Sequence, residues 1–327
     1  MASQQIYAAP RPAILHDPAR AHDQAVAAQG FATAQMWWVM AGSLLAFAVL
    51  MHRAGLSVAL WSSSNIPYLA AAGLVAAVRA GWIGANLPQA HALRDCAGYY
   101  ALFTAMALTG AAASYPIAAL THGYADQTLA RSDAALGFDW VAWYRTVADH
   151  RILQLLGTAA YQSIYLTPAI LLGRFALTGQ RREAHRFLGS FWLAAVITLA
   201  LFSLMPAVGP FSYLWHGPIR YMPSSELWQP DLIPALRAGT FHTIDLSELR
   251  GLVSAPSFHA AAGALYLRAA WRAGPARWPL VWVVGAMLLA TPVEGTHYLT
   301  DMIVGMGVAV LAMAVIDALL VREVPAA

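Results

Sequence analysis

Two histidines and an aspartate stand out as the residues of this chain that could do chemistry. His297 and Asp301 are four residues apart in the stretch Gly-Thr-His-Tyr-Leu-Thr-Asp at 295–301. If this stretch is helical, the two side chains lie one turn apart on the same face. The aspartate can then accept the Nδ1–H of the histidine, which leaves Nε2 free and basic. This spacing predicts a histidine that acts as a nucleophile.

A second histidine stands in a matching context. His259 ends the stretch Ser-Ala-Pro-Ser-Phe-His at 254–259, and like His297 it lies at the head of an apolar run. Helix N-termini carry unpaired N–H groups and the positive end of the helix dipole, so two such starts favour an anion. Ser254 and Thr296 are suitable N-caps for the two helices. The pattern predicts one shared site for phosphoryl chemistry.

That chemistry gives each group a role. His297 attacks phosphorus through Nε2, and Asp301 stabilises the imidazolium that forms. His259 protonates the leaving oxygen and then activates the acceptor that cleaves the phosphohistidine. Backbone N–H groups near Ser257, together with an arginine, would hold the phosphoryl oxygens. This mechanism requires no metal and no other cofactor.

The composition is typical of a membrane protein. Of the 327 residues, 59% are hydrophobic and 11% are charged, whereas soluble domains carry about 25% charged residues. The formal net charge is only +3, which gives no reason to expect a nucleic-acid partner. The single cysteine, Cys96, excludes an intrachain disulfide. We therefore expect an integral membrane protein whose surroundings are the lipid bilayer.

The hydrophobic runs predict an all-α polytopic fold, because a spanning helix needs about 20 apolar residues. We expect eight segments, at 36–51, 66–78 with an extension that could reach 83, 97–120, 152–172, 187–204, 256–271, 278–292 and 297–320. Residues 1–35 are polar and predict a disordered tail. Residues 36–96 then hold the N-terminal transmembrane segments, and residues 97–321 form the catalytic core.

Two connections between the predicted spans are long. In the first, at 121–151, residues 133–143 could lie flat at the membrane interface as a short amphipathic helix. The second, at 205–253, is rich in proline, glycine, tryptophan and tyrosine. Loops of this length are usually functional or disordered, and the aromatic residues favour an ordered cap.

Arginine placement orients the predicted spans. Cytoplasmic loops carry an excess of arginine, and the dense clusters at 181–186 and 268–277 fall on one side of the membrane. The spans at 256–271 and 297–320 are separated by one return helix, so both begin on the opposite side. We therefore expect the active site at the extracytoplasmic face, in a bacterial inner membrane.

The motifs resemble those of a known superfamily. Pro-Ser-Phe-His at 256–259 and His-Tyr-Leu-Thr-Asp at 297–301 are similar to the second and third signature motifs of the type 2 phosphatidic acid phosphatase (PAP2) superfamily, and most of all to its branch containing the inositol phosphorylceramide synthases. Leu-Met-Pro-Ala-Val-Gly-Pro at 204–210 is similar to the first motif of that branch. The resemblance covers about 133–311. It implies a six-helix core with one or two additional N-terminal segments, a His–Asp nucleophile and a second histidine as acid and base.

Two departures from the phosphatase pattern affect the phosphate clamp. The phosphatases have an arginine six residues before the nucleophile, where this chain has Thr291, and their first-motif lysine has no counterpart because the chain contains none. We predict that Arg250, Arg220 and Ser257 bind the phosphate instead. Glu294, three residues before the nucleophile, could bind a hydroxyl of the acceptor or cap the turn.

The sequence thus predicts a metal-independent membrane enzyme that moves a phosphoryl group from a lipid phosphate or a phospholipid headgroup donor. A phosphatase would give the phosphohistidine to water, and a phosphotransferase would give a phospho-alcohol group to a lipid hydroxyl; the resemblance favours the transferase. Two other classes of protein stay open. The two histidines and the aspartate could form a facial metal site, or they could relay protons in a polytopic transporter, although no inverted repeat supports this.

Overall fold

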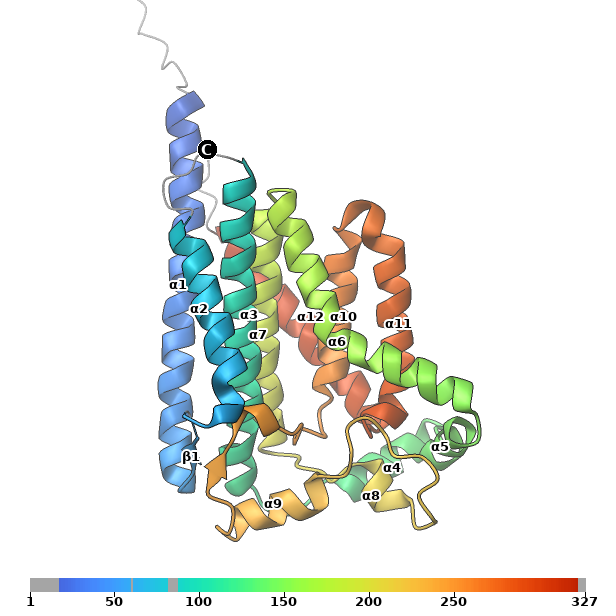
Figure 1. Cartoon of the computed structure of the whole chain (residues 1–327). Coiled ribbons are helices and arrows are strands. Elements are labelled where there is room, and N and C mark those ends of the chain that lie inside the picture. Colours follow the sequence, from blue (N-terminus) through green and yellow to red (C-terminus); the bar gives the residue numbers. More distant parts are fainter. Residues whose placement is uncertain (1–17, 60, 82–87, 323–327) are drawn as a thin grey trace, which may run out of the picture.

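The computed structural model describes residues 18–59, 61–81 and 88–322, and most of these are helical (Figure 1). The α-helices are α1 (Pro18–Ala54), α2 (Ile66–Gly81), α3 (Pro88–Ala119), α4 (Asp126–Ala135), α5 (Trp140–Ala148), α6 (Arg151–Leu177), α7 (Arg181–Phe202), α8 (Pro210–Leu214), α9 (Gln229–Arg237), α10 (Phe258–Trp271), α11 (Arg277–Glu294) and α12 (Leu299–Arg322). Short 3-10 turns are η1 (Ser63–Asn65), η2 (Leu246–Glu248) and η3 (Gly274–Ala276). Strands β1 (Ser57–Val58) and β2 (Thr243–Ile244) pair in parallel.

Six helices of the described chain are long and apolar enough to cross a membrane, and they lie within α1, α3, α6, α7, α11 and α12. This confirms the all-α polytopic fold. Two expected spans are shorter than a full crossing, because α2 has 16 residues and α10 has 14. At 1.5 Å per residue α10 rises only about 21 Å, and non-helical residues lead to its start. The extension of the second span beyond residue 81 lies outside the described residues.

The N-terminal tail differs from the expectation. We expected disorder through residue 35, but α1 already begins at Pro18 and continues without a break to Ala54. Residues 1–17 lie outside the described part of the chain. The first apolar run is therefore the second half of one long helix rather than a separate element.

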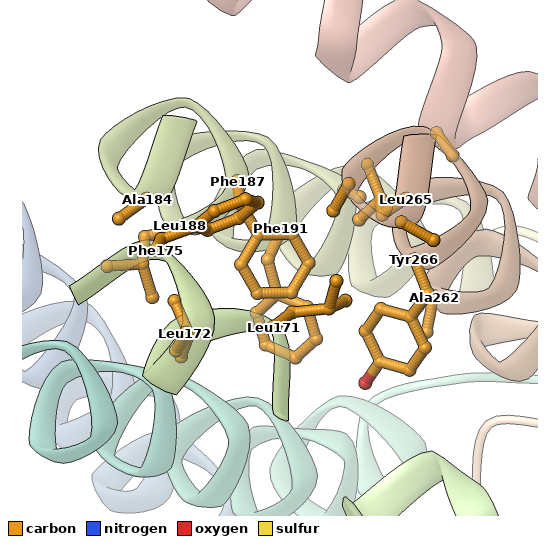
Figure 2. Close-up of a cluster of buried hydrophobic side chains, with 14 of the residues drawn as sticks. Leu171, Leu172, Phe175, Ala184, Phe187, Leu188, Phe191, Ala262, Leu265 and Tyr266 are labelled. Carbon is orange, nitrogen blue, oxygen red and sulfur yellow. The ribbon is translucent and has the colours of Figure 1, made fainter. Parts of the chain in front are cut away.

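A central part of the core of the bundle lies among α6, α7 and α10 (Figure 2), and the same buried cluster extends to α1, α3, α11 and α12. Large apolar side chains from α6, α7 and α10 interlock there: Leu171, Leu172, Phe175, Phe187, Leu188, Phe191, Leu265 and Tyr266. The contacting face of α10 is rich in fully buried alanines. Small residues let membrane helices approach closely, so α10 is enclosed by α6, α7, α11 and α12.

Ion pairs join four helix termini at one end of the bundle. Arg181 at the start of α7 lies 2.7 Å from Asp95 in α3. Asp317 near the end of α12 pairs with Arg186 of α7 at 2.8 Å and with Arg268 of α10 at 2.6 Å. Since α10 and α12 both end here, both begin at the opposite end. The histidine motifs therefore share that opposite end, as the order of the helices predicted.

The two long connections are folded and lie across that opposite end (Figure 1). The prediction of one short amphipathic helix at 133–143 is wrong. The chain forms two helices here, α4 and α5, with a turn between them. Gly137 has a φ of 74° in this turn, and Asp139 caps α5 by accepting the N–H of Ala142 at 3.0 Å. The second connection contains α8, α9, η2 and β2, and β2 pairs with β1.

Candidate active site

The predicted pair of His297 and Asp301 forms, but from a turn rather than from within one helix. α12 begins at Leu299, so the histidine precedes the helix and the aspartate lies in its first turn. Nδ1 of His297 lies 3.1 Å from Oδ1 of Asp301 and 2.8 Å from the carbonyl oxygen of Ser254. A carbonyl oxygen can only accept, so Nδ1 carries the proton and Nε2 carries the free lone pair. The tautomer is the one that a nucleophile needs.

His259 faces this pair from the first turn of α10. The centroids of its ring and of the His297 ring are 6.0 Å apart, with 52° between the ring planes. Tyr161 of α6 stacks on His259 at 4.4 Å and 14°, and its hydroxyl lies 3.5 Å from Nδ1 of His259. Tyr161 therefore orients the second histidine. From the sequence, the polar stretch at 161–163 predicts hydrogen bonding between helices, and this contact agrees with it. No signal in the sequence indicated that the partner of Tyr161 is His259.

Ser257 is the N-cap of α10, in place of the expected Ser254. Its hydroxyl accepts the N–H of Ala260 at 3.2 Å, and its own N–H donates to the carbonyl oxygen of Asp301 at 3.1 Å. The side chain is fully buried. Ser257, which we expected to bind phosphate through backbone N–H groups near it, thus has its own N–H and its hydroxyl engaged by α12 and α10.

The start of α12 also differs from the expectation. Thr296, the expected cap, has a φ of 51°, and its buried hydroxyl has no hydrogen-bond partner among the described residues. The first N–H groups of the helix are bound instead by a carboxylate from α4, Asp133. The backbone at Thr296 turns the chain so that His297 points back toward Ser254.

Glu294 at the end of α11 binds the second long connection. Its buried carboxylate accepts the hydroxyl of Tyr221 at 2.6 Å, the N–H of Ser224 at 3.1 Å and the hydroxyl of Ser224 at 2.6 Å. Its carbonyl oxygen also accepts the N–H of Ser225 at 2.9 Å. Burial, and then the hydrogen bond to Glu294, raise the pKa of Tyr221 to about 12, so the phenol remains a donor at neutral pH. Glu294 therefore ties the cap to the residue stretch that leads into His297.

The two predicted phosphate-binding arginines are engaged by other side chains. Nη1 of Arg220 lies 2.9 Å from Oδ1 of Asp149, and both side chains are more than half exposed, at 64% and 51%. The guanidinium of Arg250 lies over the ring of Trp228 at 4.1 Å. Thr291, which stands where the phosphatases have an arginine, donates its hydroxyl to the carbonyl of Met287 within the same helix. The geometry thus brings together the two histidines and Asp301, without these arginines.

The sequence left open a facial metal site made of the two histidines and the aspartate. Within the described ranges, no group of three or more histidine, cysteine, aspartate and glutamate side chains is placed to hold a metal ion. The site contains one histidine, His297, whose Nδ1–H is bound by Asp301, and a second histidine, His259, beside it.

Comparison with known families gives one match. A family model described as the PAP2 superfamily matches residues 127–315, which is more than half of the chain. The matched range includes all three motifs and the helices α5 to α11 in full. Neither the curated proteins nor the solved structures contain a match to the chain.

Proposed function

Because the chain belongs to the PAP2 superfamily, we propose that it is a lipid phosphatase or phosphotransferase that works through a phosphohistidine at His297. Membership supports phosphatase-type or phosphotransferase-type activity on a substrate in the bilayer. The observation that carries the finer proposal is the double restraint on His297 Nδ1–H, held by the Ser254 carbonyl and the Asp301 carboxylate. That restraint leaves Nε2 as the only ring atom that can attack.

The proposed reaction has two halves that balance. In the first, the Nε2 lone pair of His297 forms the N–P bond while the P–O bond to the leaving group breaks, and protonated His259 gives its proton to the departing oxygen. Asp301 stabilises the imidazolium that results. In the second, an acceptor hydroxyl gives its proton to His259 while its oxygen attacks phosphorus and the N–P bond breaks. The acceptor is water in a phosphatase and a lipid hydroxyl in a transferase.

The motifs favour a transferase related to the inositol phosphorylceramide synthases. The short His-Tyr-Leu-Thr-Asp motif at 297–301 supports that branch, as does the absence of a first-motif lysine. We further propose that the site faces the extracytoplasmic side of a bacterial inner membrane. The ion-paired arginines at the other end of the bundle support this orientation, because cytoplasmic ends are rich in arginine.

The decisive experiment is to trap the covalent intermediate. The purified protein is mixed with phosphatidic acid labelled at phosphorus, quenched in alkali and digested. We expect acid-labile label on the peptide that contains His297, and none in His297→Ala or Asp301→Ala. His150→Ala, which removes an exposed histidine at the start of α6, is the matched control and should label normally. Label on another residue, or turnover by His297→Ala, would overturn the mechanism.

A second measurement separates the two subclasses. Inorganic phosphate released from the lipid is measured with and without added alcohols, ceramide among them. A phosphatase releases phosphate at the same rate with and without the added alcohols. A transferase moves the phosphoryl group from the lipid phosphate to the added alcohol, forms a new phosphomonoester, and releases less phosphate when an acceptor is present.

A further inference from the structure

Helix α4 presents two buried carboxylates on one face. Asp126 and Asp133 are seven residues apart, which is close to two helical turns. Their exposed fractions are 1% and 3%. Neither carboxylate belongs to the three motifs or takes part in the proposed reaction. Buried carboxylates need several hydrogen-bond donors, and all the donors found here come from the motifs.

Asp126 binds the first motif and the third together. Its carboxylate accepts the N–H groups of Val208 and Gly209, each at 3.0 Å, and the hydroxyl of Tyr298, also at 3.0 Å. Tyr298 is the residue next to His297, and it is fully buried. One side chain of α4 therefore joins the proline-rich turn to the stretch that holds the nucleophile.

Asp133 caps the helix that carries Asp301. Its carboxylate accepts the N–H of Leu299 at 2.9 Å, the N–H of Thr300 at 2.8 Å and the hydroxyl of Thr300 at 2.6 Å. These N–H groups lie in the first turn of α12 and have no partner within the helix. Asp301 completes the turn, because its Oδ2 accepts the N–H of Tyr298 at 2.8 Å.

The position of Asp301 depends on that first turn. His297 lies outside the helix, so the carboxylate keeps its distance to Nδ1 only if α12 stays wound from Leu299 onward. Helix ends fray when their N–H groups are unpaired. A misplacement of about 1 Å at a reacting group can cost about 100-fold in rate. Contacts that keep the first turn of α12 wound therefore also keep Asp301 at its distance from His297.

We propose that Asp126 and Asp133 are positioning residues, and that α4 is a clamp that fixes residues 298–301 against His297. The proposal rests on the function proposed above, since it assigns these residues to the same reaction. It predicts an effect on the chemical step rather than on lipid binding. It also predicts a local effect on the backbone that does not depend on any assay of activity.

The kinetic test uses Asp133→Ala and Asp133→Asn in the full-length protein. We expect Asp133→Ala to lower kcat about 10- to 100-fold and to leave KM for phosphatidic acid within about twofold. The amide of Asp133→Asn has one accepting oxygen, so it keeps part of the cap and should recover part of kcat. Asp139→Ala, which removes the exposed cap of α5, is the matched control and should stay near the wild-type kcat.

The second readout is hydrogen exchange measured by mass spectrometry on the protein in detergent. Asp133→Ala should speed exchange at 298–301 at least tenfold, while Asp139→Ala should not. If Asp133→Ala does not fold, Asp133→Asn and Asp126→Asn give the same comparison. Unchanged exchange at 298–301, or an effect on KM alone, would overturn the clamp. If the wild-type protein turns over neither a lipid phosphate nor a phospholipid, the proposed function fails, and exchange at 298–301 still decides the clamp.

Discussion

The carbonyl oxygen of Ser257 lies so close to Gly305 that a β-carbon at position 305 would overlap it. One turn earlier in α12, the carbonyl oxygen of Asp301 accepts the N–H of the same serine at 3.1 Å. The start of α10 is therefore docked on the first two turns of α12 through backbone atoms. His259 follows Ser257 by two residues, so this docking sets how far its ring lies from the nucleophile.

The first prediction is that Gly305→Ala separates the two histidines. The added methyl group meets a backbone carbonyl, which cannot move aside as a flexible side chain would, and overpacking of this kind costs about 1–3 kcal/mol. We expect kcat to fall at least tenfold, measured as phosphate release from phosphatidic acid. Gly307→Ala is the control, because nothing lies within 4 Å of its added carbon, and it should behave like the wild type. A wild-type kcat in Gly305→Ala would show that the close contact between Ser257 and Gly305 does not determine the distance between the two histidines.

The meeting of the histidine motifs could be predicted because it depends on spacing and on the order of the helices. A separation of four residues places His297 near Asp301 whether the histidine lies in the helix or two residues outside it. Two helices joined by one return helix must begin at the same end of a bundle. These two facts need no knowledge of side-chain packing, and the structure agrees with both.

The contacts that hold the site residues in place could not be predicted from the sequence. They involve either backbone atoms, which every residue has, or side chains that are far away along the chain. The acceptor nearest to His297 is a backbone carbonyl, that of Ser254, and every residue has one. Asp133 caps α12 from 166 residues away. Arg220 was predicted from its place in the cap alone, and the neighbour that decides its position, Asp149, comes from another loop.

The second prediction concerns the tie between Tyr221 and Glu294. Tyr221→Phe removes the donor at 2.6 Å and leaves a buried carboxylate with one partner fewer. Hydrogen bonds to charged groups contribute about 1.5–3 kcal/mol, so we expect a lower melting temperature and faster proteolysis of the cap at 205–253. Tyr213→Phe, a partly exposed tyrosine of α8, is the control. Equal melting temperatures for the two variants would contradict the tie.

The third prediction is the pH dependence of that tie. The pKa of Tyr221 is raised to about 12 in the folded protein, against about 10 in an unfolded chain. A group whose pKa is higher in the folded than in the unfolded protein adds to the free energy of unfolding below the unfolded pKa, here about pH 10. That contribution is lost as the pH rises toward the folded pKa, about 12. The difference in melting temperature between wild type and Tyr221→Phe should therefore be constant from pH 6 to about pH 9 and then shrink. A difference that grows above pH 10 would have the wrong sign.

The fourth prediction tests the acid role of His259 through the leaving group. A departing lipid alkoxide needs a proton, whereas a nitrophenolate leaves well without one. We expect His259→Ala to slow the release of diacylglycerol from phosphatidic acid about 100-fold or more, and to slow the first turnover of a nitrophenyl phosphate ester much less. Tyr161→Phe keeps the stacked ring but loses the hydroxyl near Nδ1, so its effect should be intermediate. Equal losses on both substrates would remove His259 from the acid role.

The last prediction concerns Arg220, which the sequence placed at the phosphate. Its guanidinium forms an exposed ion pair with Asp149, and such pairs are worth about 0–1 kcal/mol. We therefore expect Arg220→Ala and Asp149→Ala to have the same small effect on stability and a KM for phosphatidic acid within about twofold of wild type. A tenfold rise in KM for Arg220→Ala but not for Asp149→Ala would mean that the guanidinium leaves Asp149 to bind the phosphate. Comparison of the two variants separates these outcomes because both break the ion pair, and only one removes a positive charge.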